Sequence, residues 1–384
     1  MLRPKTHQNP TSEVAEQLFR VLERNLQCAG GAMHRNKHIA GDNNFMRAFV
    51  SILIPAYNAE NWIADTLESA IAQTWSHKEI IVVDDGSTDG TLAIARRFEP
   101  KGVRVITQPN QGAAAARNRA SSLSRGDYIQ WLDADDLLSP DKVTVQMQAA
   151  EETKDRRTLF SSQWASFRYR PAKAKFIPTP LCSDLDPTEW LTRKWEGNWH
   201  MQTATWLVSR ELTEAAGPWD GRLLGDDDGE YFFRVINAST GIRFVPQSRV
   251  YYRITPSSRL SHIGRSNKKM EAQFLGMKLQ IGYLRARDDS DRVRAACVNY
   301  LQTWLPNFYP NRPDLVQEAQ QLAASLGGRL SLPKASWKYA WIEKLFGFAA
   351  AKHTQLSYNQ IKSSALRAWD KMMYSVDHRS RSVS

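Results

Sequence analysis

The stretch VSILIPAYNAENWIADTLESAIAQT, residues 50–74, followed by EIIVVDDGSTDGT, residues 79–91, decides the fold class. Each begins with a run of apolar, mostly branched residues that ends at a Pro or at paired acids, which is typical of a buried strand. Helical periodicity follows the first strand, with Ile63, Leu67 and Ile71 on one face. This order predicts βαβ units built around a parallel sheet.

The same alternation continues for two more units. VRVITQ (103–108) and DYIQWLD (127–133) are predicted strands, and GAAAARNRASSLS (112–124) and SPDKVTVQMQAA (139–150) are predicted helices. Ligands bind at the carboxyl ends of the strands in such sheets, so chemistry is expected at PAYN, DDGS and DADD.

Capping residues refine two of these helices. The helix over 88–98 is expected to be capped by Thr88 or Asp89, and the helix over 139–150 to carry Pro140 in its first turn.

The second half of the chain mixes strands and helices. Strands are predicted over the segments 158–170, 203–209, 243–246 and 249–254. The segment 266–373 is predicted to be almost wholly helical, with breaks at Pro306, Pro310, Pro313 and Pro333.

The chain is therefore divided into three parts. Residues 1–48 form an N-terminal helix (12–27) and a Gly-containing linker. Residues 49–260 form an α/β domain that divides into two halves, 49–150 and 151–260. Residues 261–384 form a helical extension.

Composition excludes several classes of protein. The chain has 384 residues, of which 42% are hydrophobic, and it contains 13 Trp, 14 Phe and 12 Tyr, which is too aromatic for a disordered chain. Three widely separated cysteines exclude a disulfide framework and a four-cysteine zinc site. No apolar run approaches the about 18 residues of a membrane span, and the polar start MLRPKTHQNP shows no secretory signal. We therefore expect a cytoplasmic location.

The positive charge of the chain is concentrated near its C-terminus. Residues 1–260 carry 32 Lys and Arg against 31 Asp and Glu, whereas residues 261–384 carry 19 against 9. Such a region could bind nucleic acid or an anionic membrane, but a solvated helical surface is the commonest interpretation. Within it, SWKYAWIEKLFGFAAAK (336–352) places Trp337, Trp341, Leu345 and Phe348 along one helical face. Packing on a neighbouring helix is commoner for such a face than contact with a bilayer.

Two acidic clusters follow predicted strands. Asp133, Asp135 and Asp136 crowd three carboxylates together, which favours a hard cation such as Mg²⁺ or Mn²⁺. Alternatively, the cluster is a solvated loop that caps the next helix. Residues 84–90, DDGSTDG, combine a tight turn with a helix N-terminus, which suits either a nucleotide or ordinary capping.

Four segments, namely 50–74, 79–91, QPNQGAAAARNRA (108–120) and GDYIQWLDADDLLSPDKV (126–143), together resemble family 2 glycosyltransferases of the GT-A fold. Four motifs on successive strands in this order and spacing are far more specific than any one of them. The resemblance implies a mostly parallel, Rossmann-like sheet flanked by helices, with a nucleotide-binding half over residues 49–150 and an acceptor half over residues 151–260.

The resemblance also implies roles for individual residues. The nucleotide sugar is expected to contact the residues Pro55, Ala56, Tyr57, Asn58, Glu60, Asp85, Asn110, Gly112, Arg117, Asp133 and Ala134. Asp135 is the expected ligand of a divalent cation, with Asp133 beside it and His262 as a further candidate ligand. A lone loop histidine such as His262 is more often without such a role.

The catalytic base is expected in GDDDGEYFFRV (225–235). In the family a carboxylate precedes an Arg by six residues, and Asp228 stands six residues before Arg234. Asp227 takes the place of the usual Glu and remains a rival. The same acids also suit the first turn of a helix, whose dipole they complement. Trp219 in GPWDGRL replaces the usual Phe of a turn upstream.

The reaction that the resemblance implies is metal-dependent transfer of a sugar, with inversion, from a nucleotide-diphosphate sugar to a hydroxyl acceptor. The acceptor is expected in cell-surface polysaccharide or glycoconjugate synthesis. A nucleotidyltransferase would need a Gly-rich basic loop after the first strand, which PAYNAEN does not provide. A non-catalytic nucleotide-sugar or glycan-binding relative remains the alternative. No nucleic-acid module is present in the sequence, and peripheral contact of the basic helices with a membrane stays open.

Overall fold

A five-stranded sheet forms the centre of the α/β part of the protein. The computed structural model describes residues 48–255 and 266–381, with side chains up to residue 376. Within these residues the strand order is β3-β2-β1-β4-β7. The first four strands in the chain pair in parallel as predicted, and only the pairing of β4 with β7 is antiparallel. The strands are β1 (Val50–Ala56), β2 (Lys78–Asp84), β3 (Val103–Thr107), β4 (Tyr128–Trp131) and β7 (Val208–Ser209).

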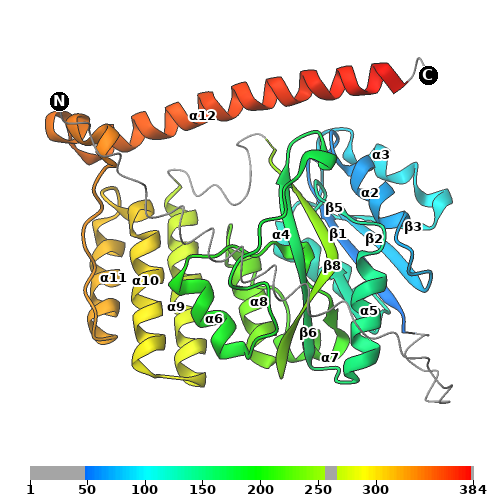
Figure 1. Cartoon of the computed structure of the whole chain (residues 1–384), viewed down its shortest axis with the longest axis horizontal. Helices are drawn as coiled ribbons and strands as arrows, with labels where there is room; N and C mark the ends of the chain where they lie inside the picture. The colour runs from blue at the N-terminus through cyan, green and yellow to red at the C-terminus, as the bar shows by residue number, and fades with distance from the viewer. Residues whose placement is uncertain (1–47, 256–265, 382–384) are drawn as a thin grey trace, which may run out of the picture. The chain divides into compact units, whose positions relative to one another are not determined.

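Helices connect the parallel strands, as the alternating sequence pattern predicts (Figure 1). The predicted cap of α3 is wrong: Gly90 is the N-cap residue, although Asp89 accepts a hydrogen bond from Thr91 N at 3.0 Å. Pro140 lies before α5 rather than in its first turn. The connecting helices are α2 (Ile63–Ile71), α3 (Thr91–Arg96) and α4 (Ala113–Leu123), and a further helix, α5 (Lys142–Thr153), follows the last of the four strands.

A second, three-stranded sheet has the order β5-β8-β6. Its strands are β5 (Leu137–Leu138), β6 (Thr158–Phe167) and β8 (Gly241–Arg253). The two strands predicted at 243–246 and 249–254 are one continuous strand, β8. The predicted strand at 203–209 is mostly a 3₁₀ turn over Thr203–Thr205, because only Val208–Ser209 pairs as β7.

Seven helices are described in the second half of the chain. They are α6 (Pro187–Glu196), α7 (Arg210–Ala216), α8 (Asp227–Ala238), α9 (Asn267–Arg287), α10 (Asp291–Phe308), α11 (Pro313–Ser325) and α12 (Ala340–Arg381). Pro306 does not break the helix as expected: it lies in the last turn of α10, two residues before the helix ends. Short 3₁₀ helices lie at Glu99–Lys101, Pro171–Lys173 and Trp337–Tyr339.

One hydrophobic cluster extends from the sheet into the C-terminal helices. It includes Trp131 of β4, Trp195 of α6, Phe233 of α8 and Tyr300 of α10. The indole of Trp195 stacks on the Tyr300 ring with centroids 4.4 Å apart. The helices that follow residue 260 therefore share a core with the half of the protein that carries the predicted base. A second cluster packs α2 and α3 on the other face of the sheet.

Two sequence predictions lie outside the described residues: the helix over 12–27 and His262 in its loop. Within the residues that the structure describes, no helix has both the length and the apolarity needed to cross a bilayer.

Candidate active site

A cleft of about 780 Å³ opens at the carboxyl ends of β1, β2 and β4. This is the edge at which a parallel sheet places its ligand. It brings together most of the residues that the sequence singled out: Pro55, Ala56, Tyr57, Asn58, Asp85, Asn110, Gly112, Arg117, Asp133, Ala134, Asp135, Asp227 and Asp228.

Two strand-end loops are held against each other on one side of this cleft. Asn58 N donates to Ser87 Oγ at 3.0 Å, and Thr88 N donates to Asn58 Oδ1 at 2.8 Å. Glu60 does not line the cleft: its Oε2 accepts from Gly90 N at 2.8 Å. Glu60 therefore positions the loop that follows β2, whereas the contact predicted between Glu60 and the nucleotide remains a prediction.

Asp85 fastens a third loop to the first two. Its carboxylate accepts from Gln111 N at 3.0 Å and from Gly112 N at 2.8 Å. Gly86 has a φ of 69°, and a Cβ there would lie 2.8 Å from Asn110 N. Only glycine therefore allows the turn after β2 to approach this loop so closely. The predicted contact of Asp85 with the nucleotide base stays a prediction.

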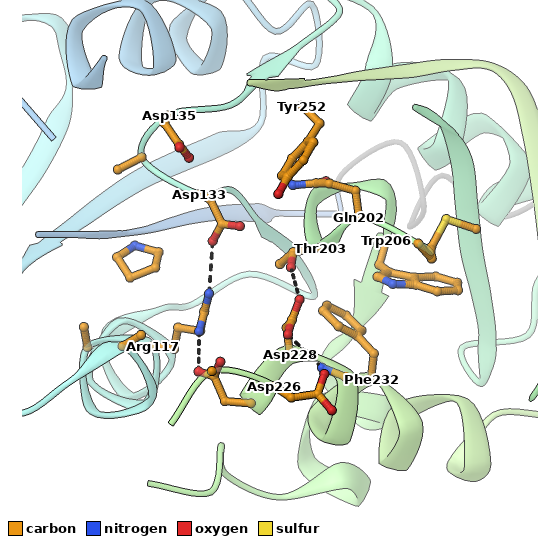
Figure 2. A pocket seen from close by; sticks show the side chains of 18 of the residues that line it. Arg117, Asp133, Asp135, Gln202, Thr203, Trp206, Asp226, Asp228, Phe232 and Tyr252 are labelled. Atoms are coloured by element: carbon orange, nitrogen blue, oxygen red, sulfur yellow. Dashed lines mark hydrogen bonds and ion pairs between the residues drawn. The ribbon is translucent and has the colours of Figure 1, made fainter. Parts of the chain in front are cut away.

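Arg117 joins the two acidic clusters across the cleft. Its Nη1 lies 2.5 Å from Asp227 Oδ2 and its Nη2 lies 3.0 Å from Asp133 Oδ1, as Figure 2 shows. The guanidinium also lies over the Trp219 ring, 4.4 Å from its centroid. Burial would lower the pKa of Arg117, but the nearby carboxylates, led by Asp227, raise it above its usual value. Arg117 is therefore a permanent cation between the two clusters.

Asp227 and Asp228 begin α8 but face different partners. Asp227 is buried against Arg117, and burial raises its pKa while the Arg117 charge opposes that rise. Asp228 lines the cleft, where its Oδ2 accepts from Thr203 Oγ1 at 3.2 Å and its Oδ1 from Gly229 N at 2.9 Å (Figure 2). The first turn of a helix favours both negative charges, so the capping interpretation of these acids also holds.

A third acid, Asp226, also lines the cleft. Its Oδ2 accepts from Gln273 Nε2 at 3.1 Å and from Gln280 Nε2 at 3.2 Å. Burial, together with the negative charge of Asp228, raises the pKa of Asp226 to about 7. Lys194 lies near both acids, and burial lowers the pKa of its ammonium group.

The acids of the Asp-Ala-Asp-Asp cluster, residues 133–136, have different surroundings. Asp136 is buried and accepts from Arg253 N at 2.7 Å and from Gln202 Nε2. Asp133 and Asp135 line the cleft. Arg253 Nε also donates to the carbonyl oxygen of Asp135 at 2.8 Å, which fixes the backbone of this loop.

The carboxylates that line the cleft suit a hard cation that is also coordinated by a bound substrate. Among the described residues, no group of three or more His, Cys, Asp or Glu could hold a metal ion alone. Mg²⁺ is commonly bound by one or two carboxylates together with substrate phosphates, and Asp133 and Asp135 offer that number.

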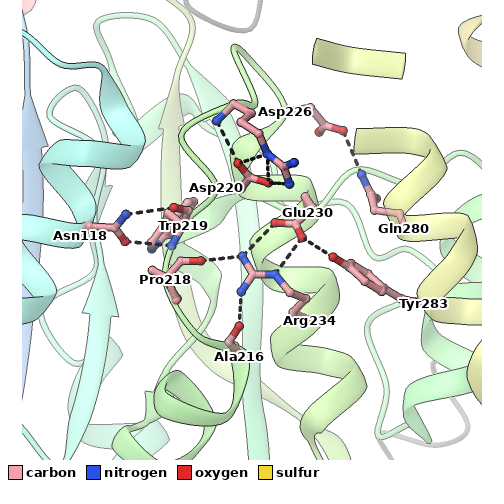
Figure 3. A network of polar contacts seen from close by, with 11 residues as sticks. Asn118, Ala216, Pro218, Trp219, Asp220, Asp226, Glu230, Arg234, Gln280 and Tyr283 are labelled. Atoms are coloured by element: carbon pink, nitrogen blue, oxygen red, sulfur yellow. Dashed lines mark hydrogen bonds and ion pairs between the residues drawn. The ribbon is translucent and has the colours of Figure 1, made fainter. Parts of the chain in front are cut away.

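Arg234, six residues after Asp228, connects α8 to the turn that precedes it. Its Nε donates to Glu230 Oε1 at 2.8 Å, and its other nitrogens donate to the carbonyl oxygens of Ala216 and Pro218 (Figure 3). Trp219 is then held by Asn118, whose side chain bonds the backbone of Trp219 at 2.8 and 2.9 Å. These contacts fasten the start of α8 to the turn over residues 216–219, and so to α4.

Several residues of the cleft were not found from the sequence. Lys194, His200, Gln202, Thr203 and Tyr252 line it. They come from α6, from the segment after it and from β8, and their spacing in the chain shows no periodicity.

The mostly parallel sheet, its flanking helices and its acidic strand ends are those of an α/β fold of the GT-A type. Residues 51–199 match the model of the family described as Glycosyl transferase family 2. Over that segment, which is less than half of the chain, the chain is similar to glycosyltransferase family 2, whose members transfer sugars.

Proteins that are similar in sequence also bear the names of glycosyltransferases. The chain is 28% identical over 243 residues to the glycosyltransferase YibD of Escherichia coli, covering 59% of this chain and 68% of that protein. It is 41% identical over 105 residues to the putative teichuronic acid biosynthesis glycosyltransferase TuaG of Bacillus subtilis, covering 27% of this chain and 42% of TuaG. The chain thus spans less than half of TuaG.

Solved structures agree on the fold. Staphylococcus aureus TarS (residues 1–349) superposes with a TM-score of 0.55 at 17% identity, covering 72% of this chain and 80% of that one. At this identity the likeness concerns the fold alone.

Proposed function

We propose that the protein transfers a glycosyl unit from a nucleotide-diphosphate sugar to a hydroxyl acceptor, with inversion at the anomeric carbon. The placement of Asp228 is the observation that carries this proposal. Asp228 lines the cleft beside Thr203, whereas its rival Asp227 is paired with Arg117. A carboxylate that already neutralises a buried guanidinium is a poor proton acceptor. Asp228 is therefore the general base of the proposal.

The donor is assigned to the side of the cleft formed by the strand-end loops. Tyr57 is 48% exposed and lines the cleft, so its ring is available to a nucleobase. TarS has been solved in complex with UDP and with UDP-GlcNAc. We infer a nucleotide sugar of this general kind, whose base and sugar stay open.

The acceptor is assigned to the opposite side of the cleft. Trp206, Phe232 and Tyr252 line it there, and the rings of Trp206 and Phe232 stack with centroids 5.7 Å apart (Figure 2). Trp206 and Phe232 are buried, whereas Tyr252 is partly exposed, and a partly exposed aromatic ring beside a few polar groups suits the C–H faces and hydroxyls of a glycan. TuaG and the chondroitin synthase of Pasteurella multocida bear names that describe polysaccharide synthesis. We extend that role to this chain.

The proposed reaction is one displacement. Asp228 takes the proton of the acceptor hydroxyl while the acceptor oxygen bonds to the anomeric carbon, and the bond from that carbon to the phosphate oxygen breaks. Arg117 orients Asp133 and pairs with Asp227 beside the donor. Enzymes of the family generally use a divalent cation, which Asp135 and Asp133 would hold. When bound, it supplies neutralising charge for the leaving diphosphate.

The proposal also covers where the protein lies in the cell and whether it contacts a membrane. We assign the protein to the cytoplasmic side, where nucleotide sugars would reach the cleft. Contact of the C-terminal helices with an anionic membrane is a prediction that α12 supports.

Replacing Asp228 by Asn tests the base. This substitution keeps the shape and removes the charge, so we expect kcat to fall about 10²–10⁴-fold while donor affinity changes little. The assay measures sugar transfer for kcat, calorimetry for donor binding and NMR for the anomeric configuration of the product.

Asp227→Asn is the matched comparison. It should retain more activity than Asp228→Asn, and thermal melting of both variants separates lost chemistry from lost folding. An inactive Asp227→Asn beside an active Asp228→Asn would move the base to residue 227. A wild-type protein that binds nucleotide sugars but transfers none, to any acceptor tried, would support the non-catalytic alternative.

A further inference from the structure

The C-terminal helix α12 packs on the catalytic part of the protein through one of its faces. Asp370 Oδ1 pairs with Arg170 Nε at 2.8 Å, and Arg367 Nη1 donates to the carbonyl oxygen of Thr255 at 3.2 Å. The Tyr374 ring lies 6.2 Å from that of Tyr169. In Figure 1, α12 runs along one edge of the molecule above the other helices.

The opposite face of α12 presents large apolar side chains to solvent. At about 100° per residue, the packed residues Arg367, Asp370 and Tyr374 fall within an arc of about 60°. Five of the six exposed large apolar side chains of residues 358–376 fall within an arc of about 80° centred on the other side, and the sixth, Leu366, lies outside that arc. The five are Tyr358 (58% exposed), Ile361 (70%), Trp369 (59%), Met372 (50%) and Val376 (53%).

A second exposed apolar group precedes the kink in α12 at Gly347, whose φ is 81°. Trp337 is 82% exposed, Trp341 61% and Leu345 67%, at a spacing of four residues. These are the side chains that sequence reasoning expected to pack on a neighbouring helix. They are exposed instead, and of that set only Phe348 is partly covered, with its ring 5.2 Å from Tyr309.

The charge of this segment is positive, and its acids are already occupied. Residues 337–376 contain six Lys and Arg against two acids, Glu343 and Asp370. Asp370 pairs with Arg170, and Glu343 accepts from Ala335 N at 2.8 Å. The lysines at positions 338, 344, 362 and 371 are exposed. The segment therefore offers solvent an apolar stripe accompanied by cationic side chains.

We propose that the outward face of α12, residues 358–376, together with the exposed residues at 337–345, lies on the surface of an anionic lipid bilayer. Tryptophan favours the level of the lipid head groups, and an amphipathic basic helix lies in that plane with its apolar face inserted. Each nearby lysine adds attraction for anionic lipid. A second copy of the chain fits less well, because two such faces would bring like charges together.

Vesicle binding by the full-length protein tests this proposal. Cosedimentation should show binding to vesicles of phosphatidylcholine mixed with an equal amount of phosphatidylglycerol, and much weaker binding to phosphatidylcholine alone. Binding should weaken as salt rises, because exposed charges are screened beyond about 10 Å at 0.1 M. Absence of binding to the anionic vesicles at low salt would overturn the proposal.

Two double variants identify the face that binds. Ile361→Asn with Trp369→Asn removes two members of the apolar stripe and should reduce the partition coefficient about tenfold or more. The matched control, Leu356→Asn with Leu366→Asn, removes two exposed apolar residues of α12 that lie outside the stripe (46% and 45% exposed). It should retain binding within about threefold.

Two further outcomes would contradict the proposal. Equal loss of binding in both double variants would show that the stripe is not the bilayer contact. A dimer in light scattering that the Ile361→Asn, Trp369→Asn variant dissociates, without vesicle binding by the wild type, would assign the face to self-association.

Discussion

Replacing Arg117 by Met should destabilise the folded protein more than any other single change in the cleft. The side chain of Arg117 is 9% exposed and that of Asp227 is 11% exposed, and their charged atoms are 2.5 Å apart. Removing one partner of a buried ion pair leaves the other charge uncompensated and costs about 3–5 kcal/mol of unfolding free energy. Met retains much of the aliphatic volume beside Trp219, so the decrease in unfolding free energy results mainly from the missing charge.

The second partner of Arg117 contributes less to this loss. The Asp133 side chain is 29% exposed, so water can solvate its carboxylate once the guanidinium is gone. We therefore attribute most of the expected loss to Asp227. The double variant with Asp227→Asn should recover most of the lost free energy, because no buried anion then remains.

The pH dependence of the loss gives an independent check. Burial already raises the pKa of Asp227, and Arg117 is the main influence that lowers it. Without Arg117 the folded-state pKa of Asp227 rises further above its unfolded value. A group of this kind stabilises the fold at low pH and loses that contribution as pH rises through its folded pKa. The variant should therefore lose less stability at about pH 5 than at about pH 8.

Urea unfolding followed by tryptophan fluorescence measures these differences. A loss below about 1 kcal/mol that is the same at both pH values would refute the reasoning, since that is the size expected of an exposed pair. Additive losses from Arg117→Met and Asp227→Asn would refute the coupling between the two residues.

Two remaining predictions concern the other acids of the cleft. Asp135→Ala should abolish transfer and remove the Mn²⁺-dependent part of nucleotide binding in calorimetry; metal-dependent binding that survives in this variant would contradict the assignment. Asp226, with its pKa raised to about 7 by burial and by Asp228, stabilises the fold at low pH and loses that contribution as pH rises toward 7. The melting temperature of Asp226→Asn minus that of the wild type should therefore increase from about pH 5 to about pH 8. A difference that stays the same over this pH range would contradict the prediction.

The parallel sheet could be predicted because each strand is a short branched run closed by a turn. β8 could be predicted only as two separate strands, because Pro246 interrupts its pattern and argues against a strand interior. The pairing of β8 with β6 passes from Val245↔Ser162 directly to Arg249↔Gln163. The intervening residues are unpaired with β6 there, so the missing N–H of Pro246 needs no partner.

The acids of the site could be found from the sequence, but which of them are buried in ion pairs or hydrogen bonds and which face the cleft could not. Arg117 and Asp227 are 110 residues apart, and nothing local in either segment indicates their ion pair. Asp136 belongs to the same acidic run as Asp135, yet it is buried against Arg253 and Gln202. Which carboxylate faces a cleft depends on partners that the tertiary fold supplies.

The outward face of α12 and the cleft are linked by contiguous packing. Asp370 accepts from Tyr169 N at 2.9 Å, the Tyr169 ring lies 5.7 Å from Trp62, and Arg253 lies over Trp62 at 4.8 Å while bonding the carbonyl oxygen of Asp135. Contiguity alone is no coupling free energy. Residues 361 and 369 lie on the face of α12 opposite this path, so substitutions there should alter vesicle binding without disturbing the cleft. Failure of the vesicle experiment would then leave the glycosyl-transfer proposal standing, and failure of the Asp228 experiment would leave the membrane proposal standing.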